Sequence, residues 1–270
     1  MNPTRTSSIA TGALFVAATL VALGAAALDP TLSGKNYLTA VAHHPGRLAA
    51  SVLLYLAAAG TSAGIAIALY PVLKGVHATL ALGSVIFRAI ECALYAVAAV
   101  SLLSIVPLGQ EFATASPDSQ APIHTIANSM LSMRDHATLA GVLAFSIGSL
   151  MYYTVFYRSR LVPRWLSGWG ILGVLSMMIA CLQALFSDNP VTGYTVLILP
   201  IAVQEMVLAL WLIFKGFDLS ETRSIAKGGH SASDGGPYSD ASGKRIKPPT
   251  PPESLPVGRG GREVPATLQA

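Results

Sequence analysis

Long apolar runs separated by short polar connections are the dominant pattern of this chain. A helix rises about 1.5 Å per residue, so about 20 apolar residues cross the hydrocarbon core of a bilayer, which is about 30 Å thick. The runs lack the alternation of barrel strands, and lipid offers backbone amides no hydrogen-bond partner. The pattern therefore predicts an all-α integral membrane bundle of six transmembrane helices, over Ile9–Leu28, Leu48–Tyr70, Ala78–Val106, Ala137–Phe156, Gly168–Phe186 and Tyr194–Phe214.

The first run also resembles a secretory signal, because Arg5 precedes it and the alanines at 25–27 resemble a cleavage region. Signal peptides have apolar cores of about 7 to 15 residues, whereas this run has about 20 before Asp29. We therefore expect a retained helix. Cleavage would leave five spans.

Basic residues in the connections predict the orientation, because Lys and Arg favour the cytoplasmic side of a membrane. One side of the predicted bundle has only Lys35, Arg47 and Arg134. The other side has Arg5, Lys74, Arg158, Arg160, Arg164, Lys215, Arg223 and Lys227. Both termini are therefore expected in the cytoplasm.

Composition supports the membrane class, since 53% of the residues are hydrophobic and 11% are charged, against about 25% charged in an ordinary soluble domain. The net charge of +4 is explained by cytoplasmic flanks beside anionic lipid, so we expect membrane lipids and no nucleic acid as partners. Cys92 and Cys181 lie in predicted spans, where core packing explains them.

The chain changes character after Phe217, where Gly, Pro, Ser and charged residues dominate, including Pro248–Pro252 and Gly258–Arg262. Such a segment cannot bury enough apolar area to offset the entropy of ordering it. Residues 218–270 are predicted to form a disordered cytoplasmic tail. The proline cluster is also able to adopt polyproline II and bind a protein partner.

Gly168, Gly170 and Gly173 match the glycine spacing of a dinucleotide-binding loop, and Asp188 lies 20 residues after the first of them. That motif needs a preceding buried strand, whereas a basic loop with Pro163 precedes these glycines. Close helix packing explains them better, and no cofactor is expected.

The adjacent His43 and His44 invite a metal site. Neighbours in sequence do not share a helical face, and no Cys or carboxylate lies close by, so we expect a solvated loop and no metal. Gly60 and Gly64 form a small-xxx-small pattern that allows close helix approach, either inside the bundle or in a homo-oligomer.

Charged residues inside the runs are the strongest indication of function, because a charge at the bilayer centre costs about 2.5 to 3.5 kcal/mol even on lenient scales. Arg88 and Glu91 share a face of the third helix, and Tyr95 extends it. Gln204 and Glu205 lie near the middle of the sixth helix, after Pro200, which is expected to bend it.

Depth along the helices predicts that these residues meet. Arg88 lies about 10 residues, or roughly 15 Å, from the cytoplasmic end of its helix, and Glu205 lies equally far from the Lys215 end of the sixth. Glu91 then lies about one turn further out, which leaves one cation between two carboxylates. Such a pair of carboxylates does not ionise freely around one cation, so one of them is expected to hold a proton.

Further candidates for this site are weaker. His136 faces either the cavity mouth or the headgroups, Arg134 and Asp135 are expected to be interfacial charges, and Gln183 is equally explained by one interhelical hydrogen bond. The connection from Pro107 to His136 is expected to contain a short helix over Ile123–Met133.

Several strings occur in order along the chain: Leu69–Lys74, Arg88–Glu91, Leu161–Leu166 with Gly168–Gly170, and Gln204–Glu205 followed by Leu210–Ile213 and Lys215–Phe217. Together they resemble the bacterial membrane proteins of the domain of unknown function 4386 family, over about Thr11–Phe217. The resemblance implies a multi-span protein of a bacterial cytoplasmic membrane. It supplies no substrate and no catalytic residue.

Three hypotheses for function follow. In the first, the Arg88, Glu91 and Glu205 cluster binds or moves a small solute or a proton. In the second, the cluster only fixes helix packing, and a sensory or scaffolding role falls to the tail. The third, an intramembrane lipid-modifying enzyme, is the weakest, because metal-dependent hydrolysis needs about three His or carboxylate ligands.

Overall fold

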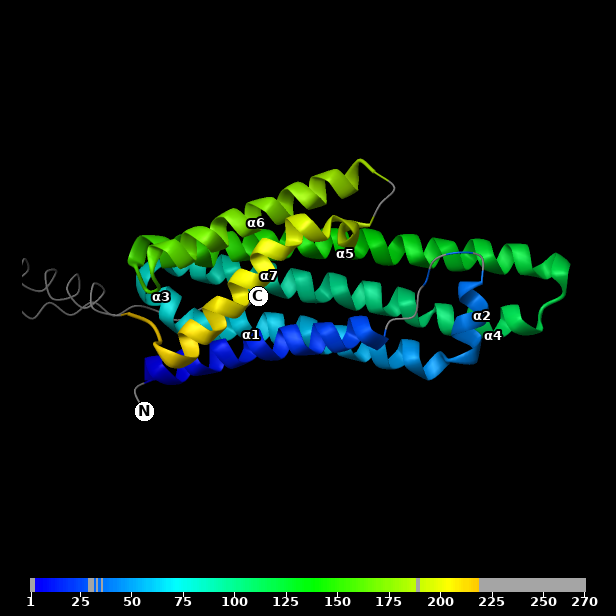
Figure 1. Ribbon diagram of the computed structural model, residues 1–270, viewed down its shortest axis with the longest axis horizontal. Coiled ribbons are helices and arrows are strands. Elements are labelled where there is room, and N and C mark those ends of the chain that lie inside the picture. The colour runs from blue at the N-terminus through cyan, green and yellow to red at the C-terminus, as the bar shows by residue number, and fades with distance from the viewer. Residues whose placement is uncertain (1–2, 29–31, 33, 35, 188–189, 219–270) are drawn as a thin grey trace, which may run out of the picture. The chain divides into compact units, whose positions relative to one another are not determined.

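The computed structural model describes residues 3–28, 32, 34, 36–187 and 190–218, and every regular element within them is a helix (Figure 1). The predicted all-α class is confirmed. Of the predicted tail at 218–270, only Asp218 lies among the described residues, and Lys35, Arg223 and Lys227 also lie outside them. The elements are α1 (Pro3–Leu28), α2 (Tyr37–His43), α3 (Pro45–Leu103), α4 (Ile105–Thr114), α5 (Pro117–Ser159), α6 (Arg164–Leu185), the 3₁₀ helix η1 (Val191–Tyr194) and α7 (Thr195–Phe214).

Helix α3 folds back on itself at His77, whose φ of −151° and ψ of 92° are not helical. Ser62 in the first half of α3 hydrogen-bonds Arg88 in the second half, 26 positions later. In a straight helix these residues would be about 39 Å apart. His77 Nδ1 accepts a hydrogen bond from the Leu80 amide at 3.3 Å, which caps the start of the second half. The two halves therefore form an antiparallel hairpin.

The helices are long and apolar enough to span a membrane. Five continuous stretches meet this description, and one of them, Pro45–Thr114, contains the hairpin at His77. The bundle therefore has five to six such helices, where the sequence predicts six. Large apolar side chains also cover its outside, including Leu20, Leu172 and Val196 with exposed fractions of 63%, 68% and 84%. Hydrocarbon is the surrounding that suits such a surface.

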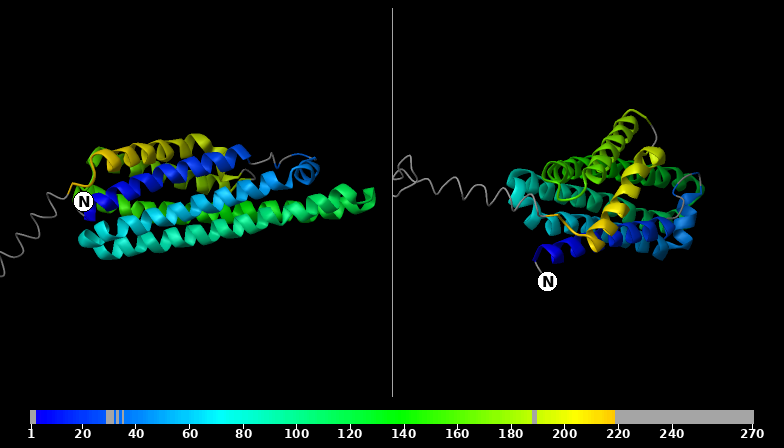
Figure 2. Two further views of the ribbon diagram at one scale, coloured as in Figure 1. Left: turned by 90° about the horizontal axis from the view of Figure 1, so that it is seen from below. Right: turned by 60° about the vertical axis from the view of Figure 1, so that its left-hand side comes forward.

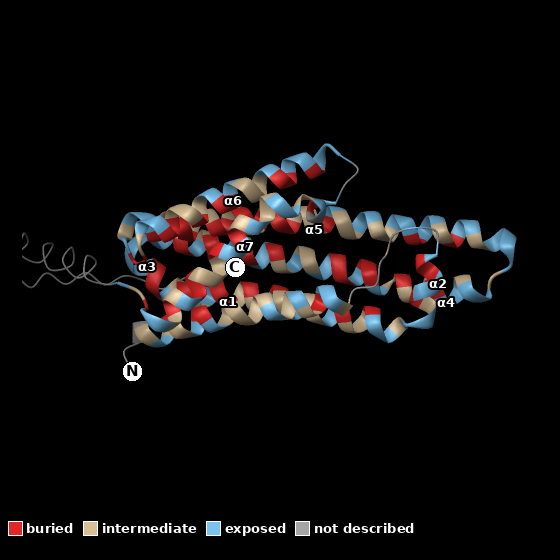
Figure 3. Cartoon of the chain, in the orientation of Figure 1, coloured by how far each residue is buried: buried red, intermediate tan, exposed pale blue. Residues whose placement is uncertain are grey.

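The helices close into a ring. Helix α1 packs on α3, α3 on α5, α5 on α6, α6 on α7, and α7 returns to α1 (Figure 2). The start of α1, the turn at His77, the loop between α5 and α6 and the end of α7 lie at one end, drawn on the left in Figure 1. We call this the basic end, since it has Arg5, Lys74, Arg158, Arg160, Arg164 and Lys215. Buried residues face the inside of the ring (Figure 3).

At the basic end, α1 is fastened to the last turn of α7. The Arg5 guanidinium donates to the carbonyls of Ile213 at 2.7 Å and Phe214 at 3.3 Å, and the Ser8 hydroxyl donates to Leu212 at 2.7 Å. The last carbonyls of a helix have no partner within it, and a cation there also complements the helix dipole. These contacts make the first helix an integral part of the bundle.

At the opposite end, α2, α4 and the first half of α5 form a second apolar core that includes Leu38, Ile105 and Ile123. Helix α5 has 43 residues, about 65 Å, which is twice the hydrocarbon thickness. Most of the predicted connection from Pro107 to His136 is therefore helical, beyond the short helix expected there. The third predicted span also ends earlier than Val106, at a turn around Ser104.

Two of the three glycines of α6 pack closely against neighbouring helices, as the sequence indicates, whereas Gly168 has only ordinary contact with Tyr157. A Cβ added at Gly173 would lie 3.0 Å from the Ile201 Cα of α7, and Gly170 meets the Tyr153 ring of α5. The segments described before them are helices and short loops, including the one at 160–163, with no strand, so the dinucleotide-loop interpretation is excluded. The two glycines of the small-xxx-small pattern differ, since Gly64 faces Leu14 of α1 whereas Gly60 has open space around it.

Candidate functional site

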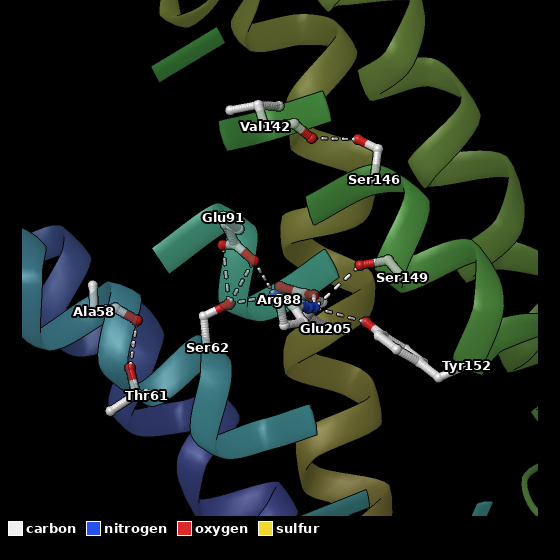
Figure 4. A network of polar contacts seen from close by, with 10 residues as sticks. All are labelled: Ala58, Thr61, Ser62, Arg88, Glu91, Val142, Ser146, Ser149, Tyr152 and Glu205. Carbon is white, nitrogen blue, oxygen red and sulfur yellow. Dashed lines mark hydrogen bonds and ion pairs between the residues drawn. The ribbon is translucent and has the colours of Figure 1, made fainter. Parts of the chain in front are cut away.

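Three charged side chains meet inside the ring (Figure 4). Arg88 Nη1 lies 3.3 Å from Glu91 Oε2, and Arg88 Nη2 lies 3.8 Å from Glu205 Oε1. The second half of α3 supplies Arg88 and Glu91 one helical turn apart, and α7 supplies Glu205. The arginine therefore lies between two carboxylates, as the comparison of depths predicts. We call these three residues the charged triad.

Hydroxyl groups from two further segments complete the coordination of Arg88. Its Nη1 donates to the Ser62 hydroxyl in the first half of α3. Its Nη2 donates to Ser149 at 3.1 Å and to Tyr152 at 3.2 Å, both on α5. The Phe145 ring covers the guanidinium at 4.2 Å, a cation–π contact. A planar fork with five donors suits such a site better than an ammonium would.

The two carboxylates of the charged triad have different surroundings. Glu91 is 3% exposed and accepts hydrogen bonds from the Ser62 hydroxyl at 3.0 and 3.1 Å. Glu205 is 18% exposed, and its buried Oε1 has no hydrogen-bond partner. Arg88 Nε is buried and equally without a partner. Glu205 is therefore the member of the triad with unused capacity to accept a hydrogen bond.

The triad lies in the wall of a cavity of about 540 Å³ that is lined by the ring of helices. Every long helix contributes to the wall, from Phe15 on α1 to Ala202 on α7. Most of the lining is apolar. Besides the triad, the charged residues in the wall are Arg134 and Asp135, which pair with each other at 2.7 Å. The volume is in the range of small-molecule sites.

Two further predicted site residues, Tyr95 and Gln204, lie in different surroundings. Tyr95 lines the cavity as expected. Gln204 points elsewhere, because its carbonyl oxygen accepts from the Tyr153 hydroxyl and its amide donates to the Leu166 carbonyl at 3.0 Å. Including Gln204 in the cavity was therefore wrong. Its contacts join α7 to α5 and α6.

The structure also changes the interpretation of the α5 residues near the cavity mouth. His136 is exposed and its Nδ1 lies 2.7 Å from the Ser132 carbonyl oxygen one turn earlier, outside the cavity wall. Arg134 and Asp135, expected at the membrane interface, line the cavity instead. Gln183 is exposed and does not line it.

Sequence reasoning missed the hydroxyl partners Ser62, Ser149 and Tyr152. A serine in an apolar helix carries little signal, because it usually bonds the carbonyl one turn earlier, as Ser146 does with Val142 at 2.8 Å. The available indication was the helical spacing of Ser149 and Tyr152, which places them on one face of α5. Among the described residues, no group of three or more His, Cys, Asp or Glu could hold a metal ion.

Comparison with protein families adds one finding. The family model of the domain of unknown function DUF4386 matches residues 10–216, which run from within α1 to just past α7 and include the whole charged triad. The chain belongs to the DUF4386 family. No curated protein and no solved structure matches it. Membership of DUF4386 and the apolar helical bundle together describe a multi-pass membrane protein, and the family brings no assigned activity to the cavity.

Proposed function

We propose that this protein binds a small solute inside the bundle and exchanges a proton there, with the charged triad as the polar anchor. The observation that carries the proposal is that the charged triad and the cavity lie at the same place in the bundle. The most exposed member of the triad, Glu205, lines a 540 Å³ cavity, and its buried Oε1 is paired with Arg88 at 3.8 Å but accepts no hydrogen bond. Intramembrane ionisable groups that face a cavity are typical of solute and proton pathways.

The charge balance of the site supports proton exchange. Arg88 contributes one positive charge, and Glu91 and Glu205 contribute up to two negative charges. Arg134 and Asp135 compensate each other. An uncompensated charge in an apolar surrounding is costly, so the second carboxylate needs either a proton or a cationic partner. Occupation of the cavity and protonation of the triad are therefore coupled.

The second candidate function is structural, and the hydrogen bonds of Arg88 favour it. Ser62, Ser149, Tyr152 and the two glutamates join both halves of α3 to α5 and α7 through this single side chain. Such a network is able to fix helix register without binding anything. A charge-swapped Arg88→Glu, Glu91→Arg variant that folds and keeps every cellular phenotype of the parent would favour the structural function over solute binding.

The proposal is tested in proteoliposomes that contain the purified full chain and an internal pH-sensitive dye. We expect proton movement that Glu205→Gln abolishes and that the exposed control Glu111→Gln leaves unchanged. Native mass spectrometry of the same samples is expected to find a retained small molecule, which Ala202→Phe displaces from the cavity wall. Its neighbour Val203 does not line the cavity, so Val203→Phe is the matched control. Equal flux and equal retained mass in all variants would refute solute and proton binding.

We place the protein in a bacterial cytoplasmic membrane, with the basic end in the cytoplasm. Six cationic side chains at that end support the orientation, because Lys and Arg in short connections remain on the cytoplasmic side. Gly60 on the outside of α3 leaves a place where a second copy can approach closely. A lipid-modifying enzyme is the third candidate, and stoichiometric zinc in the purified protein would support it.

A further inference from the structure

We infer that the solute of the cavity is an amphipathic organic cation, in which an amine or quaternary ammonium group pairs with Glu205 and an apolar body fills the space beside it. The inference rests on the proposed function, since it names the chemical class that the same cavity takes. It depends on three observations: the charge balance of the wall, the coordination of Arg88 and the aromatic lining.

The charge balance favours a cation. Among the residues that the structure describes, the charged groups that line the cavity are Arg88, Arg134, Glu91, Asp135 and Glu205. Two positive and three negative groups leave one carboxylate without a counter-charge. Arg134 and Asp135 lie 2.7 Å apart and satisfy each other, so the excess falls on the triad. A ligand with one positive charge makes the wall neutral, whereas an anion would double the imbalance.

The coordination of Arg88 disfavours an anion. The side chain is 2% exposed, and its terminal nitrogens already contact Ser62, Ser149, Tyr152 and both glutamates. Phe145 covers one face of the guanidinium at 4.2 Å. Only Nε lacks a hydrogen-bond partner. An anionic ligand would therefore have to displace existing partners and approach two carboxylates of its own sign.

Glu205 has fewer partners than Arg88. Its side chain is 18% exposed, against 3% for Glu91, and its Oε1 accepts no hydrogen bond. Arg88 is 3.8 Å from this oxygen, an ion-pair distance that is longer than a hydrogen bond, so the arginine does not saturate the carboxylate. A partly exposed carboxylate in a mostly apolar cavity wall is a strong ionic partner for a cationic ligand.

The rest of the wall suits an apolar body and the faces of a cation. Phe15, Tyr55, Tyr95 and Phe145 line the cavity, and small residues such as Ala18, Ala98 and Ala202 leave the space between them. Aromatic faces attract cations, most strongly where water is excluded. A hydrophilic cation such as Na⁺ would find few oxygen ligands there, because hard cations require about six.

Three probes with one apolar body and different charge test the inference. They are 4-phenylbutyltrimethylammonium, 4-phenylbutanol and 4-phenylbutanesulfonate, titrated into the full chain in lipid nanodiscs, with empty nanodiscs as the blank. The ammonium ion carries no exchangeable proton, so it separates cation binding from protonation. Isothermal titration is expected to give one saturable site per chain, with affinity in the order ammonium, alcohol, sulfonate.

Variants locate the site and the charge. Glu205→Gln is expected to weaken ammonium binding by about tenfold or more and to leave the alcohol nearly unchanged, because the ion pair between the ammonium group and the carboxylate is lost. Glu111→Gln is the matched control, since Glu111 is exposed on α4 and outside the cavity wall. Ala202→Phe is expected to abolish binding of every probe, and Val203→Phe to leave it intact.

The outcomes separate this inference from the proposed function. If the sulfonate binds as tightly as the ammonium ion, or if Glu205→Gln leaves the ammonium affinity unchanged, the cation assignment is overturned. Binding of the alcohol that Ala202→Phe removes would then still support a solute cavity. If no probe binds at a site sensitive to Ala202→Phe, both the cation assignment and the solute cavity fail. The comparison of probes in the parent chain remains decisive even if a variant does not fold.

Discussion

Arg88 is the side chain on which the interior of the bundle most depends, because it pairs with two carboxylates and contacts three hydroxyls. Removing one partner of a buried ion pair is far more costly than replacing the whole pair with neutral groups, since only the former leaves an uncompensated charge. This asymmetry gives a test at the scale of single residues.

Arg88→Ala is expected to lower the free energy of unfolding by about 3 to 5 kcal/mol. The triple variant Arg88→Met, Glu91→Gln, Glu205→Gln is expected to recover most of that loss, because no bare charge remains. Unfolding of the purified chain in mixed micelles measures both values. A triple variant that is less stable than Arg88→Ala would contradict the account of the triad as a cluster held together by charge pairing.

Single residues also show the limit of what the sequence predicts about the site. Arg88, Glu91 and Glu205 were identifiable because a charge in an apolar run is expensive, and depth along two helices placed them together. Gln204 was misplaced because consecutive helical residues point about 100° apart, so the neighbour of a cavity residue faces another helix. The cavity itself depends on how the helices tilt against one another, and the sequence of a single apolar run does not specify that tilt.

At the scale of elements, the hydrophobic runs identify the helices but not where each one stops. Helix α5 continues for 43 residues, through polar positions that the sequence assigns to a connection. Its extension packs on α2 and α4, where Tyr37 donates to Asn128 at 2.9 Å. Hydropathy distinguishes segments that lie in lipid from segments that lie in water. A helix is able to continue from lipid into water, so the extension of α5 could not be predicted from the hydrophobic runs alone.

The contact between α6 and α7 predicts the effect of two glycine substitutions. A methyl group at Gly173 would meet the Ile201 backbone at 3.0 to 3.1 Å, whereas at Gly168 the nearest atom is a Tyr157 ring carbon at 3.8 Å. Gly173→Ala is expected to destabilise the bundle by about 1 to 3 kcal/mol through overpacking. Gly168→Ala is expected to be neutral or slightly stabilising, because helical glycine carries an entropic cost. Thermal unfolding of both variants in detergent checks the difference, and equal melting temperatures would contradict it.

The contact between α1 and α7 gives a second prediction at this scale. Arg5→Ala is expected to destabilise the last turn of α7 by about 1 to 2 kcal/mol, since its terminal carbonyls lose a charged donor. Faster amide hydrogen exchange at 208–214 would report it. Lys215→Ala is the control, because Lys215 lies over the Trp211 ring at 4.6 Å on the exposed side. Equal exchange in the two variants would show that Arg5 does not hold α7.

For the molecule as a whole, the distribution of positive charge predicts which end faces the cytoplasm. Lys74 at the basic end and Ser119 at the opposite end are both exposed. In a background with Cys92→Ser and Cys181→Ser, we expect Ser119→Cys to react with a membrane-impermeant maleimide applied to intact cells. Lys74→Cys is expected to react only after the membrane is opened. The reverse pattern would invert the orientation.

The closing contact of the ring joins the first helix to the last, across 204 to 208 positions of sequence. A ribosome adds about 5 to 20 residues per second, so α1 is complete for roughly 10 to 40 s before α7 exists. During the later part of that interval Arg88 and Glu91 are already made, while Glu205 and the wall that carries it are not. The nascent chain therefore has to keep a charged, laterally open bundle in the membrane until its final helix is synthesised and completes the ring of helices.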